Sequence, residues 1–285
     1  RRKGGCSQPI QQGEFSPGWP LSGSQGLWFS MGLRTSLCPA PASPLFSSAP
    51  PGTPDPDARQ PVMSDRSDSG SPRDDGQALW LGPEQADRRL VLLHGWGADA
   101  DDLLDLASLL VPAGVSVVAL RAPEPHPAGV GRQWYPLLWR EMTPEPAWER
   151  VPAAREALRQ RLLALAASVP LPQTALLGFS QGAAMAIDVA TGFDQPLPLA
   201  CLIACSGYPH RDWQPQATAT PVLLTHGRED PVVPSFHGDR IQSSLEQAGI
   251  QVQRQDFRGG HGIDPALFPL MRQLLQRSWP GSSPL

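Results

Sequence analysis

A pentapeptide at residues 178–182, G-F-S-Q-G, places a serine in the pattern G-x-S-x-G. A short apolar run at 174–177 precedes it, and a stretch of good helix formers at 183–190 follows it. A serine on a sharp turn between a strand and a helix projects its hydroxyl above the sheet, and the glycines keep side chains out of the turn. The helix also directs its N-terminus at the serine, where developing negative charge is stabilised. The pattern predicts that Ser180 is a nucleophile.

A serine hydroxyl is a weak nucleophile, so it needs a base and a carboxylate that orients the base. On this kind of turn, the acid and the base follow the serine in the chain in that order. Asp230 follows the apolar run 222–225, and His261 lies in the glycine-flanked loop 259–262 after the next predicted strand. Because the carboxyl ends of parallel strands meet at one edge of a sheet, we expect both side chains beside Ser180. The three residues are predicted to form a catalytic triad.

Three neighbouring residues compete for the same roles. Glu229 is an alternative acid, and a turn or helix-capping role is the structural alternative for Asp230. His226 and His237 are alternative bases, but His226 precedes the acid and His237 begins a predicted helix. Chain order and context favour Asp230 as the acid and His261 as the base.

A tetrahedral intermediate on the serine needs backbone N–H donors. The residue after the nucleophile, Gln181, supplies one donor. The loop H-G-W-G at 94–97, after the strand that ends at Leu93, makes Trp96 the candidate for the second donor, because its glycine neighbours allow close approach of the backbone. A plain glycine turn is the alternative for this loop. The chain contains no H-E-x-x-H motif and no paired Cys/His spacing, so we predict no metal site.

These residues need a sheet to bring them together. Apolar runs and amphipathic stretches alternate along the chain. Strands are predicted at 90–93, 115–120, 174–177, 199–204, 222–225 and 252–257, and helices at 99–110, 152–165, 183–190, 235–248 and 265–277. Such alternation predicts an α/β fold with a mostly parallel sheet and helices on both faces.

The connection at 122–149 is long and rich in Pro and Trp. Connections of this length commonly form lids or binding segments. We interpret Trp134, Tyr135 and Leu137 as one wall of an apolar acyl groove beside Ser180, since a solvated loop should not expose so much apolar area. The alternative is that these aromatic side chains fold onto the domain as an additional part of its core.

The composition divides the chain into two parts. Of the first 76 residues, 35 are Pro, Ser or Gly, and no helical or strand period is sustained there. Such a segment buries too little apolar surface to offset its ordering entropy, so we predict a disordered leader at 1–76 and one domain at 77–285.

Met63 and the polar residues after it are typical of a cytosolic start, so 1–62 is interpreted as translated upstream sequence or the end of a truncated longer protein. No apolar segment follows the basic residues 1–3, so no secretory signal is predicted.

Charge and cysteine content exclude several kinds of partner. The predicted domain holds 16 Arg against 20 acidic residues and no basic block, so nucleic acid is not a predicted partner. No run reaches the roughly 18 apolar residues of a membrane span, so no integral membrane segment is predicted. Cys201 and Cys205 lie four strand residues apart, about 13 Å, which is too far for a disulfide. We therefore expect free thiols and a cytoplasmic location. The sequence does not predict an oligomeric state.

Several of these stretches resemble the phospholipase/carboxylesterase family, which includes the acyl-protein thioesterases. The similar motifs are L-H-G-W-G at 93–97, G-F-S-Q-G-A-A-M-A at 178–186, H-G-R-E-D-P-V-V-P at 226–234 and G-H-G-I at 260–263. The loop G-R-Q-W-Y at 131–135 is similar to one in bacterial carboxylesterase members of the family. The resemblance covers about residues 79 to 278. The leader matches nothing in the family, and Ala183 stands where many members have a third glycine.

The resemblance implies an α/β-hydrolase fold and a serine hydrolase without a cofactor that cleaves carboxylic ester or thioester bonds. It implies the roles already derived: nucleophile Ser180, acid Asp230, base His261, and oxyanion-hole donors Trp96 and Gln181.

The expected partner is thus a small acyl ester or thioester substrate. Two other functions use the same residues differently. An acyltransferase would pass the acyl group to an alcohol instead of water, which product ratios with added alcohol would reveal. A non-catalytic acyl-binding protein of the same fold would fail to react with a fluorophosphonate at Ser180.

Overall fold

The structure, a computed structural model, describes residues 71–140, 143–192 and 196–279. Most of the predicted leader, residues 1–70, therefore lies outside the described residues. Residues 71–76, the last part of that leader, are described. The first strand of the sheet lies there, at Arg73–Asp74, just before the expected domain start at 77.

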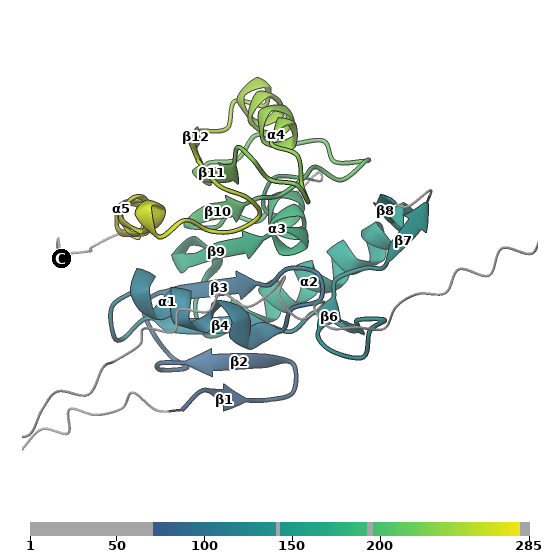
Figure 1. The fold of residues 1–285 in the computed structure, drawn as a ribbon. Coiled ribbons are helices and arrows are strands. Elements are labelled where there is room, and N and C mark those ends of the chain that lie inside the picture. Colours follow the sequence, from purple (N-terminus) through teal and green to yellow (C-terminus); the bar gives the residue numbers. More distant parts are fainter. Residues whose placement is uncertain (1–70, 141–142, 193–195, 280–285) are drawn as a thin grey trace, which may run out of the picture. The chain divides into compact units, whose positions relative to one another are not determined.

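The main sheet follows the predicted strand positions closely. Its strands are β1 (Arg73–Asp74), β2 (Ala78–Leu81), β3 (Arg89–Leu93), β4 (Ser116–Leu120), β9 (Thr174–Phe179), β10 (Cys201–Cys205), β11 (Val222–Gly227) and β12 (Val252–Phe257). Within the described residues they form one eight-stranded sheet in the order β1-β2-β4-β3-β9-β10-β11-β12 (Figure 1). The strands from β4 to β12 pair in parallel, and β2 pairs antiparallel with both β1 and β4.

Helices cover both faces of this sheet. The α-helices are α1 (Leu104–Leu110), α2 (Val151–Leu165), α3 (Gln181–Thr191), α4 (Phe236–Gln247) and α5 (Phe268–Ser278), and the 3-10 helices are η1 (Ala100–Leu103), η2 (Trp148–Arg150), η3 (Leu171–Gln173) and η4 (Pro265–Leu267). Helices α2, α3 and α4 lie on one face, and α1 and α5 lie on the other (Figure 1). The prediction of a mostly parallel sheet with helices on both faces is confirmed.

Alternate residues of each strand serve the two faces. In β3, Val91 and Leu93 pack with α2 and α3, whereas Leu90 and Leu92 pack with α1. All four side chains are buried. Because both faces are covered, a central strand is apolar along its whole length, which is why these strands appear in the sequence as continuous apolar runs.

Two parts of the fold differ from the prediction. The stretch expected as one helix at 99–110 is a 3-10 turn followed by α1, and Asp99 caps that turn through a reciprocal capping box with Asp102. The hairpin of β1 and β2 is not predicted, because it is short and depends on pairing with β4, a partner distant in the chain.

The long connection 122–149 contains two small hairpins. Strand β5 (Glu124–Pro125) pairs with β6 (Arg132–Gln133), and β7 (Leu137–Arg140) pairs with β8 (Thr143–Pro146). The second hairpin projects from the domain beyond α2 (Figure 1). Trp139 on this hairpin is 67% exposed. The connection therefore has regular structure of its own.

Candidate active site

Ser180 occupies a sharp turn between β9 and α3. Its φ of 54° and ψ of −117° lie in a region that residues with a side chain rarely adopt, so the surrounding structure must hold the turn. Its N–H donates to the carbonyl of Cys205 at 2.9 Å. A Cβ on Gly182 would lie 2.2 Å from the Leu93 carbonyl oxygen, and one on Gly178 would lie 2.4 Å from the Gly182 oxygen. The two glycines are therefore required by close backbone approach.

The structure brings the three predicted triad residues together. His261 Nδ1 lies 2.7 Å from Asp230 Oδ2, and His261 Nε2 lies 2.9 Å from Ser180 Oγ. An ionised carboxylate can only accept a hydrogen bond, so the proton of the neutral imidazole lies on Nδ1. His261 Nε2 is then free to accept the hydrogen bond that the Ser180 hydroxyl donates. This is the arrangement in which a histidine can remove a proton from a serine.

Asp230 is held as a carboxylate. Its Oδ1 accepts hydrogen bonds from the N–H groups of Val232 at 2.8 Å and Val233 at 2.9 Å. Burial raises the pKa of Asp230, but the hydrogen bonds from His261 and from these backbone groups lower it more, so the pKa lies below its ordinary value. The carboxylate stays ionised at neutral pH and can orient the imidazole.

The competing acid, Glu229, lies apart from this arrangement. Its side chain is 65% exposed and pairs with Arg258 at 3.4 Å. Although it is adjacent to Asp230 in the chain, it points to solvent. The geometry therefore favours Asp230.

The competing histidines have other neighbours. His226 Nε2 donates to the Val233 carbonyl at 2.8 Å and lies 3.6 Å from Asp230 Oδ2, so it supports the loop that carries the acid. His237 lies in the first turn of α4, as expected. In the described part of the chain, neither histidine is hydrogen-bonded to Ser180.

The two predicted oxyanion-hole donors flank the serine. Gln181 is the first residue of α3, where an N–H has no acceptor within the helix, and Trp96 lies in the turn after β3. Among the described residues, neither N–H donates to a protein acceptor. A Cβ on Gly95 would lie 3.5 Å from Ser180 Cβ, so the loop of Trp96 runs directly past the serine.

Two of the three residues expected to line an acyl groove are core residues instead. Trp134 is 1% exposed and Tyr135 is not exposed. The Trp134 indole donates to the His94 carbonyl at 2.9 Å, and the Tyr135 hydroxyl lies 2.9 Å from His210 Nε2. Because their polar atoms have partners inside the domain, burying these side chains leaves no hydrogen bond unmade. Leu137 is half-buried at the edge of the same core.

Two residues without a predicted role contact the loop of Trp96. Gln133 accepts a hydrogen bond from the Trp96 indole at 2.9 Å, and His94 Nδ1 lies 2.8 Å from the carbonyl oxygen of Gly95. His94 belongs to the 94–97 motif, so its position was visible in the sequence, but its bonding partners were not.

The described residues contain no group of three or more His, Cys, Asp or Glu side chains that could hold a metal ion. Within the same part of the chain, no helix is long and apolar enough to cross a membrane.

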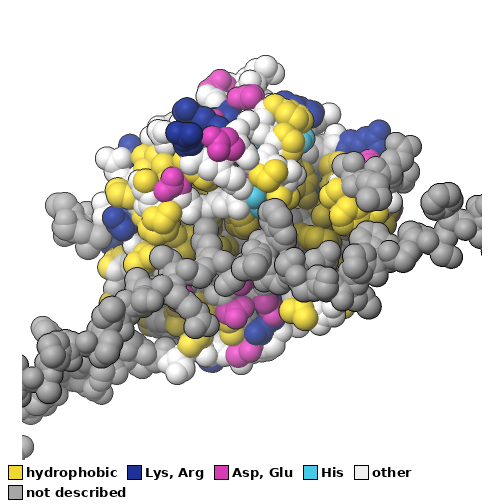
Figure 2. Space-filling model, viewed as in Figure 1, with side chains coloured by type: hydrophobic (Ala, Val, Ile, Leu, Met, Phe, Trp, Pro, Cys, Tyr) yellow, Lys and Arg dark blue, Asp and Glu magenta, His cyan; other side chains and the backbone are white. Residues whose placement is uncertain are grey.

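Cys201 and Cys205 are free and buried, and burial raises the pKa of each thiol to about 12, so neither is a reactive thiolate. On the face seen in Figure 2, Lys and Arg side chains are scattered among acidic and apolar ones.

A family model for phospholipase/carboxylesterase proteins matches residues 79–278, which include the elbow and both later loops. The chain belongs to the phospholipase/carboxylesterase family. It is a hydrolase of the esterase type, and it has the α/β-hydrolase fold of that family.

Similar proteins and solved structures agree with this assignment. Esterase YpfH of Escherichia coli (strain K12) is 30% identical over 184 residues, which cover 63% of this chain and 78% of that protein. The crystal structure of esterase PE8 is 28% identical with a TM-score of 0.61, and the match covers 70% of this chain and 96% of that one. Zea mays acyl-protein thioesterase 2 shares the fold at 22% identity, with a TM-score of 0.57 and coverage of 71% and 99%.

Proposed function

We propose that this family member cleaves carboxylic ester or thioester bonds of small acyl substrates through an acyl-enzyme on Ser180. The observation that carries the proposal is the hydrogen-bonded chain from Asp230 through His261 to the Ser180 hydroxyl. It ends at the hydroxyl of Ser180, a residue that is 7% exposed and lies on a strained turn, beside two backbone N–H groups that have no acceptor among the described residues.

In the first half of the reaction, Ser180 Oγ attacks the carbonyl carbon while its proton passes to His261 Nε2. Asp230 stabilises the resulting imidazolium and holds it in place. The N–H groups of Trp96 and Gln181 donate to the oxyanion, and the N-terminus of α3 adds a favourable dipole. When the intermediate collapses, the imidazolium gives its proton to the leaving alcohol or thiol, and the acyl group stays on Ser180.

In the second half, water takes the place of the leaving group. His261 removes a proton from the water, the hydroxide oxygen attacks the acyl carbon, and a second oxyanion forms in the same place. Collapse then breaks the acyl bond to Ser180, which regains its proton from His261, and the carboxylic acid departs. The chain, the substrate and one water molecule are sufficient to balance this sequence.

Leu137 is the remaining candidate for the acyl-binding surface. It lies half-buried near the buried Trp134 and Tyr135. Burial of acyl methylenes is worth about 0.8 kcal/mol each, so kcat/KM should rise with acyl length until the apolar surface is covered. Leu137→Ala should flatten that rise for p-nitrophenyl esters, whereas an equal loss at every acyl length would make Leu137 a scaffold residue.

The experiment that tests the proposal is labelling of the purified full chain with a fluorophosphonate, together with a panel of ester and thioester substrates. We expect covalent labelling at Ser180 and turnover of at least one substrate class. Failure to label Ser180 would contradict the acyl-enzyme and favour a non-catalytic acyl-binding role. Adding an alcohol to the assay separates hydrolysis from acyl transfer through the ratio of acid to new ester.

We also propose a reducing, cytoplasmic location, because Cys201 and Cys205 are free thiols in the core. Imaging of the full chain with a C-terminal fluorescent tag tests this. Accumulation in an oxidising compartment would contradict it.

A further inference from the structure

The direction of the Trp96 N–H depends on a single peptide unit. That N–H shares its peptide plane with the carbonyl of Gly95, and in a trans peptide the two groups point in opposite directions. Whatever binds the Gly95 oxygen therefore sets where the Trp96 N–H points. The neighbouring glycines give the loop little stiffness of its own, so this orientation has to come from outside contacts.

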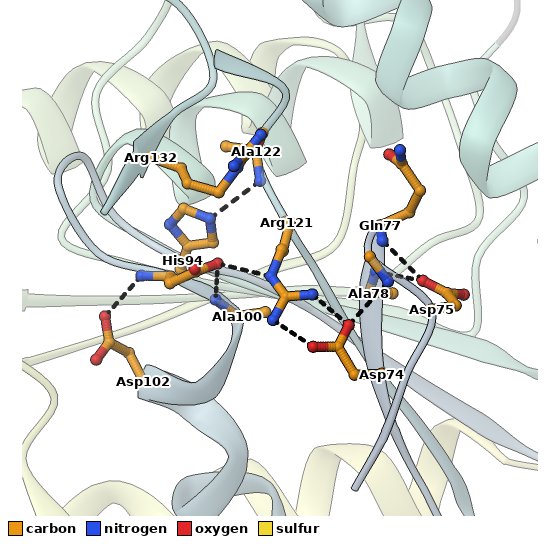
Figure 3. Close-up of polar contacts among 12 residues, drawn as sticks. Asp74, Asp75, Gln77, Ala78, His94, Ala100, Asp102, Arg121, Ala122 and Arg132 are labelled. Carbon is orange, nitrogen blue, oxygen red and sulfur yellow. Dashed lines mark hydrogen bonds and ion pairs between the residues drawn. The ribbon is translucent and has the colours of Figure 1, made fainter. Parts of the chain in front are cut away.

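His94 binds the Gly95 oxygen, and its tautomer is fixed. Its Nε2 lies 3.1 Å from the backbone nitrogen of Ala122 (Figure 3). Its Nδ1 lies 2.8 Å from the Gly95 carbonyl oxygen. A backbone N–H can only donate, so Nε2 must be the acceptor. The proton of the neutral ring is then on Nδ1, from which it donates to Gly95.

The ring has no freedom to change this pattern. His94 is 1% exposed, and burial lowers its pKa from 6.5 to about 4, so the imidazole is neutral near pH 7. The Trp134 ring lies beside it, with centroids 5.6 Å apart. The Trp134 indole also donates to the His94 carbonyl oxygen at 2.9 Å, which fixes the preceding peptide.

The connection 122–149 holds the rest of the loop. The N–H of Gly97 donates to the Arg132 carbonyl at 2.8 Å, and the N–H of Arg132 donates to the Ala98 carbonyl at 2.8 Å. The Gln133 side chain holds the Trp96 indole. On the other side of the serine, the side-chain amide of Gln181 accepts a hydrogen bond from the Trp134 backbone N–H at 2.9 Å. The same side chain donates to the Tyr135 carbonyl oxygen at 2.8 Å. One short segment therefore joins both oxyanion-hole donors.

We infer that His94 is a positioning residue, whose Nδ1–H tautomer turns the 95–96 peptide so that the Trp96 N–H faces the oxyanion formed at Ser180. Ala122 sets the tautomer, and the segment 132–135 holds the loop against the elbow. The inference rests on the proposed function, since it assigns His94 to the same oxyanion hole.

The tautomer can be tested without any variant that must fold or turn over substrate. In ¹⁵N NMR spectra of the full chain at pH 7, the two ring nitrogens of a neutral histidine have well-separated shifts that identify the protonated one. We expect the His94 resonances to show Nδ1–H. An Nε2–H tautomer at this position would overturn the inference.

The positioning role is tested by two substitutions of similar polarity. In His94→Asn the amide NH₂ takes the place of Nδ1 and can still donate to Gly95. In His94→Gln the side-chain amide takes the place of Nε2 instead, so it cannot donate to the Gly95 oxygen. For a p-nitrophenyl ester we expect kcat to fall about 10- to 100-fold in His94→Gln, with KM changed less than about threefold, because loss of an oriented donor acts on the transition state. His94→Asn should stay within about fivefold of the wild type.

Affinity for a trifluoromethyl ketone provides the readout that a purely structural role would not move. Its adduct with a serine carries an oxyanion, so its inhibition constant should weaken by the same factor as kcat/KM in His94→Gln. Equal losses in the two variants, or losses that follow their Tm values, would overturn the inference. A wild-type chain that neither labels nor turns over would instead contradict the proposed function, while leaving the tautomer measurement intact.

Discussion

Two aspartate–histidine–hydroxyl chains of similar geometry lie in this domain: Asp230–His261–Ser180 and Asp188–His210–Tyr135. We call the first the triad chain and the second the buried chain. Their carboxylate–imidazole distances are 2.7 and 2.6 Å, and both imidazole–hydroxyl distances are 2.9 Å. In each, the carboxylate fixes the histidine proton on Nδ1 and leaves Nε2 to accept from the hydroxyl.

The two chains differ in what surrounds them. In the buried chain the Tyr135 hydroxyl lies 2.7 Å from the hydroxyl of Tyr208, and Arg155 pairs with Asp188 at 3.0 Å. Burial raises the pKa of Tyr135 well above its ordinary value, so this hydroxyl does not ionise. Ser180 lies instead at the tip of a strained turn, next to the N–H groups of Trp96 and Gln181, which have no acceptor in the described part of the chain.

The comparison shows that an aspartate–histidine pair can fix the tautomer of its histidine in either setting. Whether the hydroxyl at the end of such a chain can react depends on its access to a substrate and on N–H groups that stabilise an oxyanion. The buried chain joins α2, α3, the segment after β10 and the connection 122–149. It holds these four elements together, and the connection in turn contacts Gln181 and the loop of Trp96.

The largest effect should come from removing the hydroxyl of the triad chain. We expect Ser180→Ala to lower kcat on the order of 10⁶-fold while preserving the fold, because alanine leaves the hydrogen-bond frame of the elbow intact. Initial rates and circular dichroism measure both. Ser206→Ala is a matched control, since Ser206 also has a positive φ, of 51°, at the end of β10, and it should stay within about tenfold of the wild type. Appreciable turnover by Ser180→Ala would contradict the acyl-enzyme.

Next in size should be the loss of the triad carboxylate. Asp230→Asn should lower kcat about 10⁴-fold, because the amide can hold His261 in the wrong tautomer. Steady-state kinetics on one ester measure the loss. Glu229→Gln is the control and should change kcat less than about twofold, given its exposure to solvent. The reverse order of effects would move the acid to Glu229.

The same substitution in the buried chain should act on stability. Asp188→Asn removes the buried carboxylate that pairs with Arg155, while the half-exposed carboxylate of Asp212 remains 3.3 Å from the guanidinium, so the unfolding free energy should fall by up to about 3–5 kcal/mol. Urea denaturation measures this. In the folded variant we expect kcat to remain within about threefold of the wild type. A large kcat loss at unchanged stability would mean that the buried chain takes part in the reaction.

The smallest effect should come from a histidine outside both chains. Burial depresses the pKa of His94 from 6.5 to about 4. Between these two pH values, the His94 side chain takes up a proton in the unfolded state and stays neutral in the folded state. The free energy of unfolding should fall by about 3 kcal/mol as pH falls from about 6.5 to 4, and this contribution is fully present above pH 6.5. Urea denaturation at several pH values measures the slope, and His94→Asn should make it shallower. Equal slopes in both proteins would show that His94 titrates normally.

Local patterns in the sequence were sufficient to predict most of the fold. The buried strands appear as apolar runs because helices cover both faces, and the elbow at Ser180 is marked by glycines that its close backbone approaches require. The order of Ser180, Asp230 and His261 predicted that their loops meet at one edge of the sheet, and the structure brings them together. Their catalytic roles remain predictions.

Other features depend on contacts that no local pattern contains. Trp134 and Tyr135 were interpreted as a groove wall, since the sequence shows apolar area in the connection 122–149 but not the direction in which it faces. Both residues lie between β6 and β7, outside the two hairpins. Their burial depends on hydrogen-bond partners such as His94 and His210, 40 and 75 residues away in the chain.

The tautomer of His94 is decided in the same way, by an Ala122 N–H that is 28 residues distant. Periodicity records which side chains a helix or strand buries, because those elements repeat. An irregular segment has no repeat, so only the tertiary structure determines which of its groups meet.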